Sequence, residues 1–168
     1  MSARTERILI SGMYAGLIGY AVVVVVLAGL NLIAGRSPFY TAALFGSTLF
    51  YGLDDPAALT IAAGPVLAYN GLHVLIFLGL GLVASWLVTK AEEYPILRYV
   101  VLFTLVFIAA HAYGALLLFA QPLLAGDAWW QIGIATLGAA VAMGAYLLWA
   151  HPILRWSLKD IPMGSEAG

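Results

Sequence analysis

Two histidines in apolar segments are the residues of this sequence best suited to chemistry. His73 and His111 each lie in a long stretch without a charged side chain. An ionisable group in hydrocarbon is costly, so its presence there indicates either a function or a polar partner. Imidazole nitrogens ligate haem iron and also form hydrogen bonds. The pair therefore predicts a cofactor site or a polar junction between two helices.

The two histidines are expected at similar depth in a membrane. If both segments are helical, His73 lies about 25 Å from Lys90 and His111 lies about 20 Å from Arg98, because each residue adds ~1.5 Å. About one helical turn of height then separates the imidazoles. On adjacent antiparallel helices, such a pair can hold a flat macrocycle as two axial ligands.

Neighbouring residues fit both interpretations of this pair. Asn70 shares a helical face with His73, and Gly114 shares one with His111. In a cofactor site, Gly114 leaves room for a b-type haem or a chlorin, and either imidazole alone could bond a quinone. In the alternative interpretation, the neutral imidazoles form hydrogen bonds with each other, with Asn70 or with Tyr69. These hydrogen bonds would join two helices. The candidate cofactor-binding residues are His73, His111, Asn70 and Gly114, and the candidate metal ligands are His73 and His111.

Four apolar segments must position these residues. They span 8–35, 62–89, 99–121 and 131–150. All seven basic and eight acidic residues fall outside them, and each is near or above the ~20 residues that a helix needs to cross hydrocarbon. Backbone amides find no water there, so each segment must be helical. The sequence predicts a single all-α membrane domain over 1–168, a bundle of four transmembrane helices with a cytoplasmic tail at 151–168.

The connection 37–61, between the first and second predicted helices, is the irregular part of the sequence. Ser37 followed by Pro38 is a helix start signal, and the residues after it are apolar enough to lie in the membrane interface. We expect a short interfacial or re-entrant helix there, either a simple connector or the lining of a cavity. Asp54, Asp55 and Pro56 form a second start signal, so the helix of the apolar segment 62–89 could begin as early as Pro56.

Basic residues predict the orientation of the chain. Six of the seven Lys and Arg residues lie at the N-terminus, between the second and third apolar segments, or at the C-terminus, and Arg36 lies on the opposite side. The positive-inside bias then makes both termini cytoplasmic. The first segment exceeds the ~7–15 apolar residues of a signal peptide, so we interpret it as a retained anchor. The expected location is a multi-pass position in a prokaryotic inner membrane.

Small residues predict close contacts between helices. Gly12 and Gly16 are four residues apart in the first apolar segment, and Gly138 is four residues before Ala142 in the last. Such pairs let two helix backbones approach each other. They serve either packing within the chain or the seam of a homo-oligomer.

A third histidine, His151, has a different expected role. It lies at the C-terminal end of the last apolar segment, beside Pro152. An imidazole in this place can bond the last free carbonyl groups of the helix and reach water among the headgroups. We therefore expect a structural role for His151.

Composition excludes several classes of function. A net charge of −1 without runs of like charge provides no surface for nucleic acid. The absence of cysteine excludes disulfides, thiolate metal sites and thiol catalysis. No carboxylate lies in a predicted span, so acid/base pairs and di-metal sites have no ligands there. We expect no catalytic residue and no enzymatic activity.

Three functions are compatible with these residues. The leading expectation is a non-catalytic subunit or assembly partner of a larger respiratory or photosynthetic membrane complex, in contact with lipid and other subunits. The alternative is a redox or pigment-binding protein of electron transport, with His73 and His111 as axial ligands of a b-type haem or chlorin. The third is a small carrier or channel lined by Asn70, Thr104 and the histidines.

Overall fold

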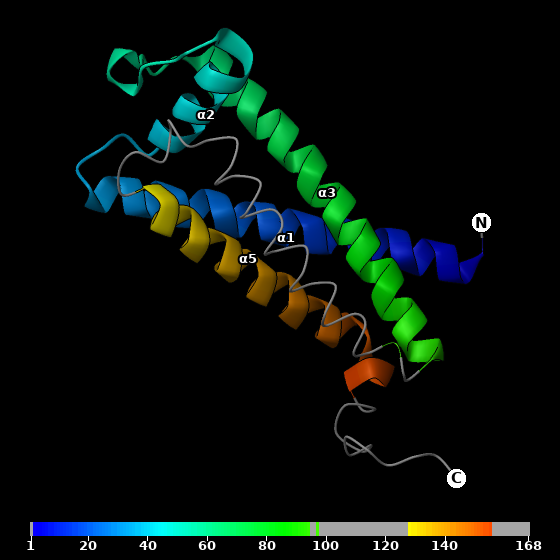
Figure 1. The fold of residues 1–168 in the computed structure, drawn as a ribbon. Helices are drawn as coiled ribbons and strands as arrows, with labels where there is room; N and C mark the ends of the chain where they lie inside the picture. The colour runs from blue at the N-terminus through cyan, green and yellow to red at the C-terminus, as the bar shows by residue number, and fades with distance from the viewer. Residues whose placement is uncertain (1, 95–96, 98–127, 156–168) are drawn as a thin grey trace.

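The computed structural model describes residues 2–94, 97 and 128–155. All regular secondary structure in these residues is helical (Figure 1). The elements are α1 (Ala3–Ile33), α2 (Tyr40–Tyr51), the short 3₁₀ turn η1 (Pro56–Ala58), α3 (Ala63–Glu93) and α5 (Ala128–Ala150). The predicted helix 99–121, with Thr104, His111 and Gly114, lies outside the described residues.

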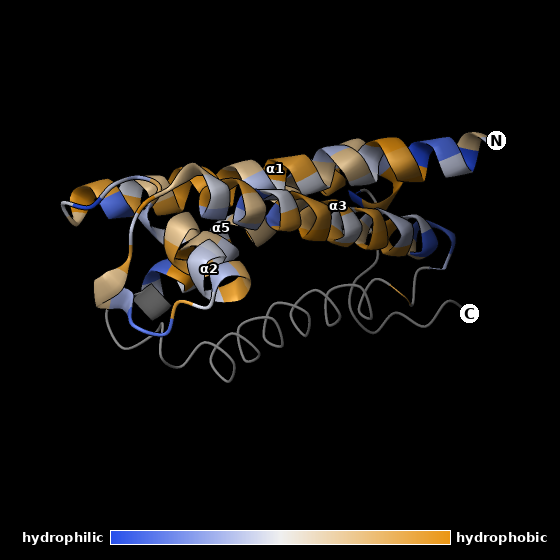
Figure 2. Cartoon of the chain, turned by 90° about the horizontal axis from the view of Figure 1, so that it is seen from above, coloured by the Kyte–Doolittle hydropathy of each residue, from blue (hydrophilic) through white to orange (hydrophobic). Residues whose placement is uncertain are grey.

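Three of the described helices are long and apolar enough to cross a membrane, namely Ala3–Ile33, Ala63–Glu93 and Trp130–Ala150. α1 and α3 have 31 residues each, a length of about 46 Å that exceeds the ~30 Å of bilayer hydrocarbon. Figure 2 shows hydrophobic colouring along the middle of both helices and hydrophilic colouring where α1 begins and α3 ends. The described part is therefore an all-helical membrane protein with polar helix ends.

α1 is the central helix of the described part, because it packs against both α3 and α5, while α2 packs against α3 (Figure 1). Glycines allow the backbones of α1 and α3 to touch. A Cβ atom at Gly12 would lie 2.8 Å from the Cα of Leu82, and one at Gly16 would lie 2.9 Å from the Cα of Leu78, both closer than real side chains permit. The glycine pair of the first apolar segment therefore serves packing within the chain.

The buried apolar side chains are mostly small. One cluster joins α1, α3 and α5 and contains Ala15, Ala84, Val88, Ala91, Leu147 and Leu154. A second cluster contains Val23, Phe77, Ala135 and Ala139. Dispersion between closely approaching backbones holds membrane helices together where lipid removes the hydrophobic driving force. The small residues make that close approach possible.

The connection after α1 contains a helix, as predicted, but the helix begins two residues later than the predicted start. Its first residue is Tyr40, and its N-cap Phe39 offers no side-chain hydrogen bond. The Ser37 hydroxyl instead accepts a hydrogen bond from the Phe39 amide at 3.3 Å, which stabilises a turn rather than a helix end. α2 ends at Tyr51, and the next residue, Gly52, caps it with a φ of 69°, the left-handed conformation that glycine adopts without strain.

The next helix does not begin as early as Pro56, but within one residue of the predicted apolar segment 62–89. Asp55 accepts a hydrogen bond from the Ala57 amide at 2.9 Å, but this cap starts only the short turn η1. Leu59 then adopts an extended conformation, with φ −61° and ψ 123°, and α3 begins at Ala63. Pro65 lies in the first turn of α3, where its missing N–H group costs no intrahelical bond.

Candidate functional site

His73 lies on the side of α3 that faces α1 and has aromatic neighbours. Its ring centroid is 4.9 Å from that of Tyr69 and 5.1 Å from that of Phe77, one turn away in each direction. Tyr20 of α1 contributes a third ring at 6.4 Å. The Nε2 atom of His73 is buried and has no hydrogen-bond partner among the described residues. A buried polar atom without a partner is uncommon and calls for an explanation.

Asn70 shares the helical face of His73 but bonds elsewhere. The Tyr20 hydroxyl donates to Asn70 Oδ1 at 2.9 Å, and Asn70 Nδ2 donates to the carbonyl oxygen of Val66 at 2.8 Å. Asn70 therefore links α1 to α3. The expectation that Asn70 hydrogen-bonds His73 is not what the structure shows, while the predicted proximity of the two residues is present.

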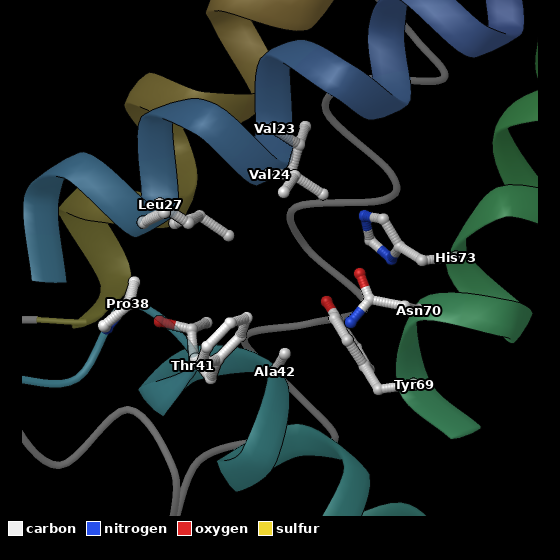
Figure 3. A pocket seen from close by; sticks show the side chains of 11 residues that line it. Val23, Val24, Leu27, Pro38, Thr41, Ala42, Tyr69, Asn70 and His73 are labelled. Carbon is white, nitrogen blue, oxygen red and sulfur yellow. The ribbon is translucent and has the colours of Figure 1, made fainter. Parts of the chain in front are cut away.

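A cavity of about 90 Å³ lies between α1, α2 and α3, beside His73. Figure 3 shows the His73 ring extending from α3 towards Val23 and Val24 of α1. The polar lining residues are Thr41, Tyr69, Asn70 and His73, and the remaining walls are apolar. None of the lining residues carries a formal charge. Because Pro38, Phe39, Thr41 and Ala42 supply one wall, α2 and the turn before it line a cavity, one of the two roles expected for this connection.

The size and chemistry of the cavity limit what it can hold. Sites for drug-sized ligands occupy about 300–1,000 Å³, so a macrocycle would need space beyond the described residues. No group of three or more His, Asp or Glu side chains in the described ranges could hold a metal ion. His111 and Gly114, the other proposed cofactor contacts, lie outside those ranges. The described part of the site offers one imidazole, an apolar chamber and no charge.

A second polar site joins three helices at the opposite end of α1. We call it the polar cluster and define it as Arg7, Ser11, Ser85, Glu92 and His151. The Arg7 guanidinium contacts both carboxylate oxygens of Glu92 at 3.2 Å and donates to the carbonyl oxygen of Ala150 at 3.3 Å. These contacts tie the start of α1 to the ends of α3 and α5.

Ser11 is the centre of the buried part of the polar cluster. Its hydroxyl oxygen lies 2.7 Å from the carbonyl oxygen of Arg7, 2.6 Å from Ser85 Oγ and 3.3 Å from His151 Nε2. A serine has a single hydroxyl proton, and the carbonyl oxygen can only accept. Ser11 therefore donates to Arg7 and accepts from Ser85 and from the Nε2–H group of His151.

Ser11, His151 and Glu92 follow the atomic order of a serine hydrolase triad, but the proton directions oppose that chemistry. A nucleophilic serine must donate its proton to the imidazole, whereas Ser11 donates to a backbone carbonyl. The serine is also only 5% exposed. His151 Nδ1 lies 3.3 Å from Glu92 Oε2 without the alignment of a hydrogen bond. The arrangement supports a structural role.

His151 is structural in a different way from the one predicted. Its ring is fully buried and contacts Ser11 and Glu92 rather than headgroup water or the last helix carbonyls. Burial lowers the pKa of His151 from its usual value, and the adjacent Glu92 carboxylate offsets part of this shift by favouring the charged imidazole. The Nε2–H group can donate to Ser11 whether the ring is neutral or charged, whereas Nδ1 can donate towards Glu92 only in the charged ring.

Sequence reasoning missed the polar cluster because its members are weak signals individually. Ser11 and Ser85 are small and common in membrane helices, and Glu92 lies beyond the predicted span 62–89. One signal was present in the sequence: Ser11 adjoins Gly12, and a small-residue face is where two helices approach each other. A hydroxyl next to such a face has a neighbouring helix within bonding distance.

No protein-family model, curated protein or solved structure matches this chain. Its function is therefore argued from its own geometry.

Proposed function

We propose that this protein is a non-catalytic integral membrane subunit or assembly partner of a larger membrane complex. The observation that carries the proposal is the apolar surface that the described helices leave uncovered. Within the most apolar window of each span, 28% of residues are buried in α1 and in α3, and 17% in α5. Among the described residues, most of this surface has no covering helix, so it can pack against lipid or against other helices.

One face of α3, opposite the side that packs on α1, fits a partner helix. It contains Gly71, Leu75, Gly79 and Val83, four residues apart, and all are exposed. No described atom lies within 4 Å of the place where a Cβ atom of Gly71 or Gly79 would stand. Because Gly71 and Gly79 have no side chain, the backbone of another transmembrane helix can approach α3 closely on either side of Leu75.

The polar cluster supports the same role. Its hydrogen bonds and ion pairs fix α1, α3 and α5 relative to one another, so the apolar exterior is held in one shape. Arg4 pairs with Glu93 at 2.6 Å and Lys90 pairs with Glu93 at 3.3 Å at the same end of the bundle. We place this basic end, with both termini, on the cytoplasmic side of a prokaryotic inner membrane.

Purification from its native membrane in mild detergent tests the proposal. The protein should elute as a stoichiometric complex with other membrane proteins, and cross-linking should map the contact to α3. Replacing Gly71 and Gly79 together by leucine places bulky side chains where the partner helix would approach, and this should release the partner. Gly29→Leu on α1 is the matched control, because it also has open space around it. A wild-type protein that elutes as a monomer without partners contradicts the proposal.

A second candidate is a redox or pigment-binding protein in which His73 and His111 are axial ligands of a b-type haem or chlorin. The observation in its favour is that His73 Nε2 is buried without a described partner. The purified protein should then show a strong visible absorption band that His73→Ala and His111→Ala each remove. Colourless protein with intact folding eliminates this candidate.

A further inference from the structure

The cavity between α1, α2 and α3 combines a mostly apolar lining with a buried nitrogen atom of His73 that forms no described hydrogen bond. Thr41 and Asn31 bond each other twice, at 2.9 and 3.2 Å, so the threonine hydroxyl is already paired. Asn70 is bonded to Tyr20 and Val66. Among the polar lining residues, His73 is the one with a buried nitrogen atom that lacks a described partner.

We propose that this cavity binds the neutral, oxygen-bearing head of a lipid-soluble molecule, with His73 as the hydrogen-bonding residue. A charged head is disfavoured because no formally charged residue lines the cavity. An oxygen-bearing head suits the imidazole, since one ring nitrogen donates and the other accepts. The broad χ2 torsion of histidine lets the ring turn a nitrogen towards such a guest.

The position of the cavity along α3 suits an amphiphile. Tyr69 and His73 are six and ten residues from the start of α3 at Ala63, which is about 9 Å and 15 Å along the helix axis. A head bound there lies near one face of the hydrocarbon layer. Apolar walls from Val24, Leu27 and Phe39 surround it. The tail of the guest can therefore remain in hydrocarbon while its head reaches the cavity.

Two classes of lipid-soluble molecule have a neutral, oxygen-bearing head: quinones or quinols, and lipid alcohols. The aromatic rings of Tyr69 and Phe39 in the lining can stack on a planar head. The volume of about 90 Å³ also suffices for a small hydroxyl head. The same inference therefore covers both, and the choice of probe separates them. It does not depend on the proposed role as a subunit.

Binding to the full-length protein in nanodiscs tests the inference, with empty nanodiscs subtracted. The probes are a benzoquinone with a ten-carbon chain and decanol. We expect saturable binding of at least one probe with a stoichiometry of one per chain. Binding of the quinone alone identifies a planar carbonyl head, and equal binding of decanol identifies a simple oxygen head.

Three variants decide whether the cavity is the site. His73→Leu keeps the side-chain bulk but removes the nitrogen atoms, and it should weaken binding about tenfold. Ala42→Leu fills the cavity from α2 and should abolish saturation. Leu72→Ala, on the exposed side of α3, is the control and should bind like wild type. The inference is overturned if neither probe saturates, or if His73→Leu or Ala42→Leu binds as tightly as wild type.

Discussion

In the polar cluster, at the start of α1 and the ends of α3 and α5, buried polar groups form hydrogen bonds across three helices. In the cavity beside α2, by contrast, the Nε2 atom of His73 has no described partner. Both regions place an imidazole among transmembrane helices. In the polar cluster, His151 contacts Ser11 and Glu92. At the cavity, aromatic rings surround His73 and leave one nitrogen unused. Each imidazole has one buried nitrogen atom without a described hydrogen bond, Nε2 in His73 and Nδ1 in His151, but of the two only His151 hydrogen-bonds another helix through its ring. The difference separates a histidine that joins helices from one whose described contacts are aromatic packing.

The largest effect is expected at Glu92, which is the shared partner of two side chains. Its side chain is only 7% exposed, and Arg7 and His151 both contact it. Glu92→Ala leaves both without their carboxylate and should lower the free energy of unfolding by about 2–4 kcal/mol. Titration with denaturing detergent measures this loss. Glu93→Ala, which removes two partly exposed ion pairs, with Arg4 and with Lys90, should cost less than about 1 kcal/mol. Equal losses for the two variants would contradict the importance assigned to the cluster.

A smaller loss is expected at the centre of the cluster. Ser11→Ala removes the hydroxyl that bonds Ser85 and His151 and should lower the free energy of unfolding by ~1–2 kcal/mol. The same unfolding titration applies. Ser47→Ala on α2 is a suitable comparison, because Ser47 is also buried but lies outside the cluster. A Ser11 variant as stable as wild type would show that these hydrogen bonds add nothing to helix association.

The next effect is a dependence of stability on pH. Burial holds the pKa of His151 below its usual value of 6.5. As the pH falls, the unfolded chain therefore takes up a proton at this position before the folded protein does. The free energy of unfolding should decrease as the pH falls through 6.5 and level off below the folded pKa of His151. His151→Gln should flatten this part of the profile. An unchanged slope in the variant would assign the dependence to other groups.

The smallest effect on stability is expected at the cavity. His73→Leu removes no described hydrogen bond and replaces an unpaired buried nitrogen by an apolar side chain. The free energy of unfolding should stay the same or rise by up to ~1 kcal/mol. Thermal unfolding in detergent measures it, with His151→Leu as the contrasting variant. A large loss at His73 would mean that its ring is as important to the fold as that of His151.

The type and approximate extent of the described transmembrane helices were predictable, because a long apolar segment in a membrane satisfies its backbone hydrogen bonds by forming a helix. The predicted helix starts that were not observed depend on competition between alternative local hydrogen bonds. Ser37 was expected to cap a helix, yet its hydroxyl stabilises a turn two residues on. Pro56 begins a single 3₁₀ turn rather than the long helix. The sequence shows which hydrogen bonds a residue can form, but the conformation of the surrounding chain determines which of them it does form.

The candidate site was predicted only in part. His73 and Asn70 were selected because polar atoms in apolar segments are rare, and both line the cavity. The wall formed by α2 was expected only as one of two roles, since sequence does not fix how a connecting helix folds back. The polar cluster was missed because its parts are far apart along the chain, with Ser11 and His151 separated by 140 positions.

The glycine contact between α1 and α3 has a mechanical consequence. Mainly backbone, rather than flexible side chains, meets α3 at Gly12 and Gly16. A tilt of α1 against α3 should therefore pivot near this crossing, which lies between the Arg7–Glu92 contacts and the cavity. Ser11 adjoins Gly12 and lies beside the pivot, so widening the cavity to admit a guest would strain the more distant contacts of Arg7.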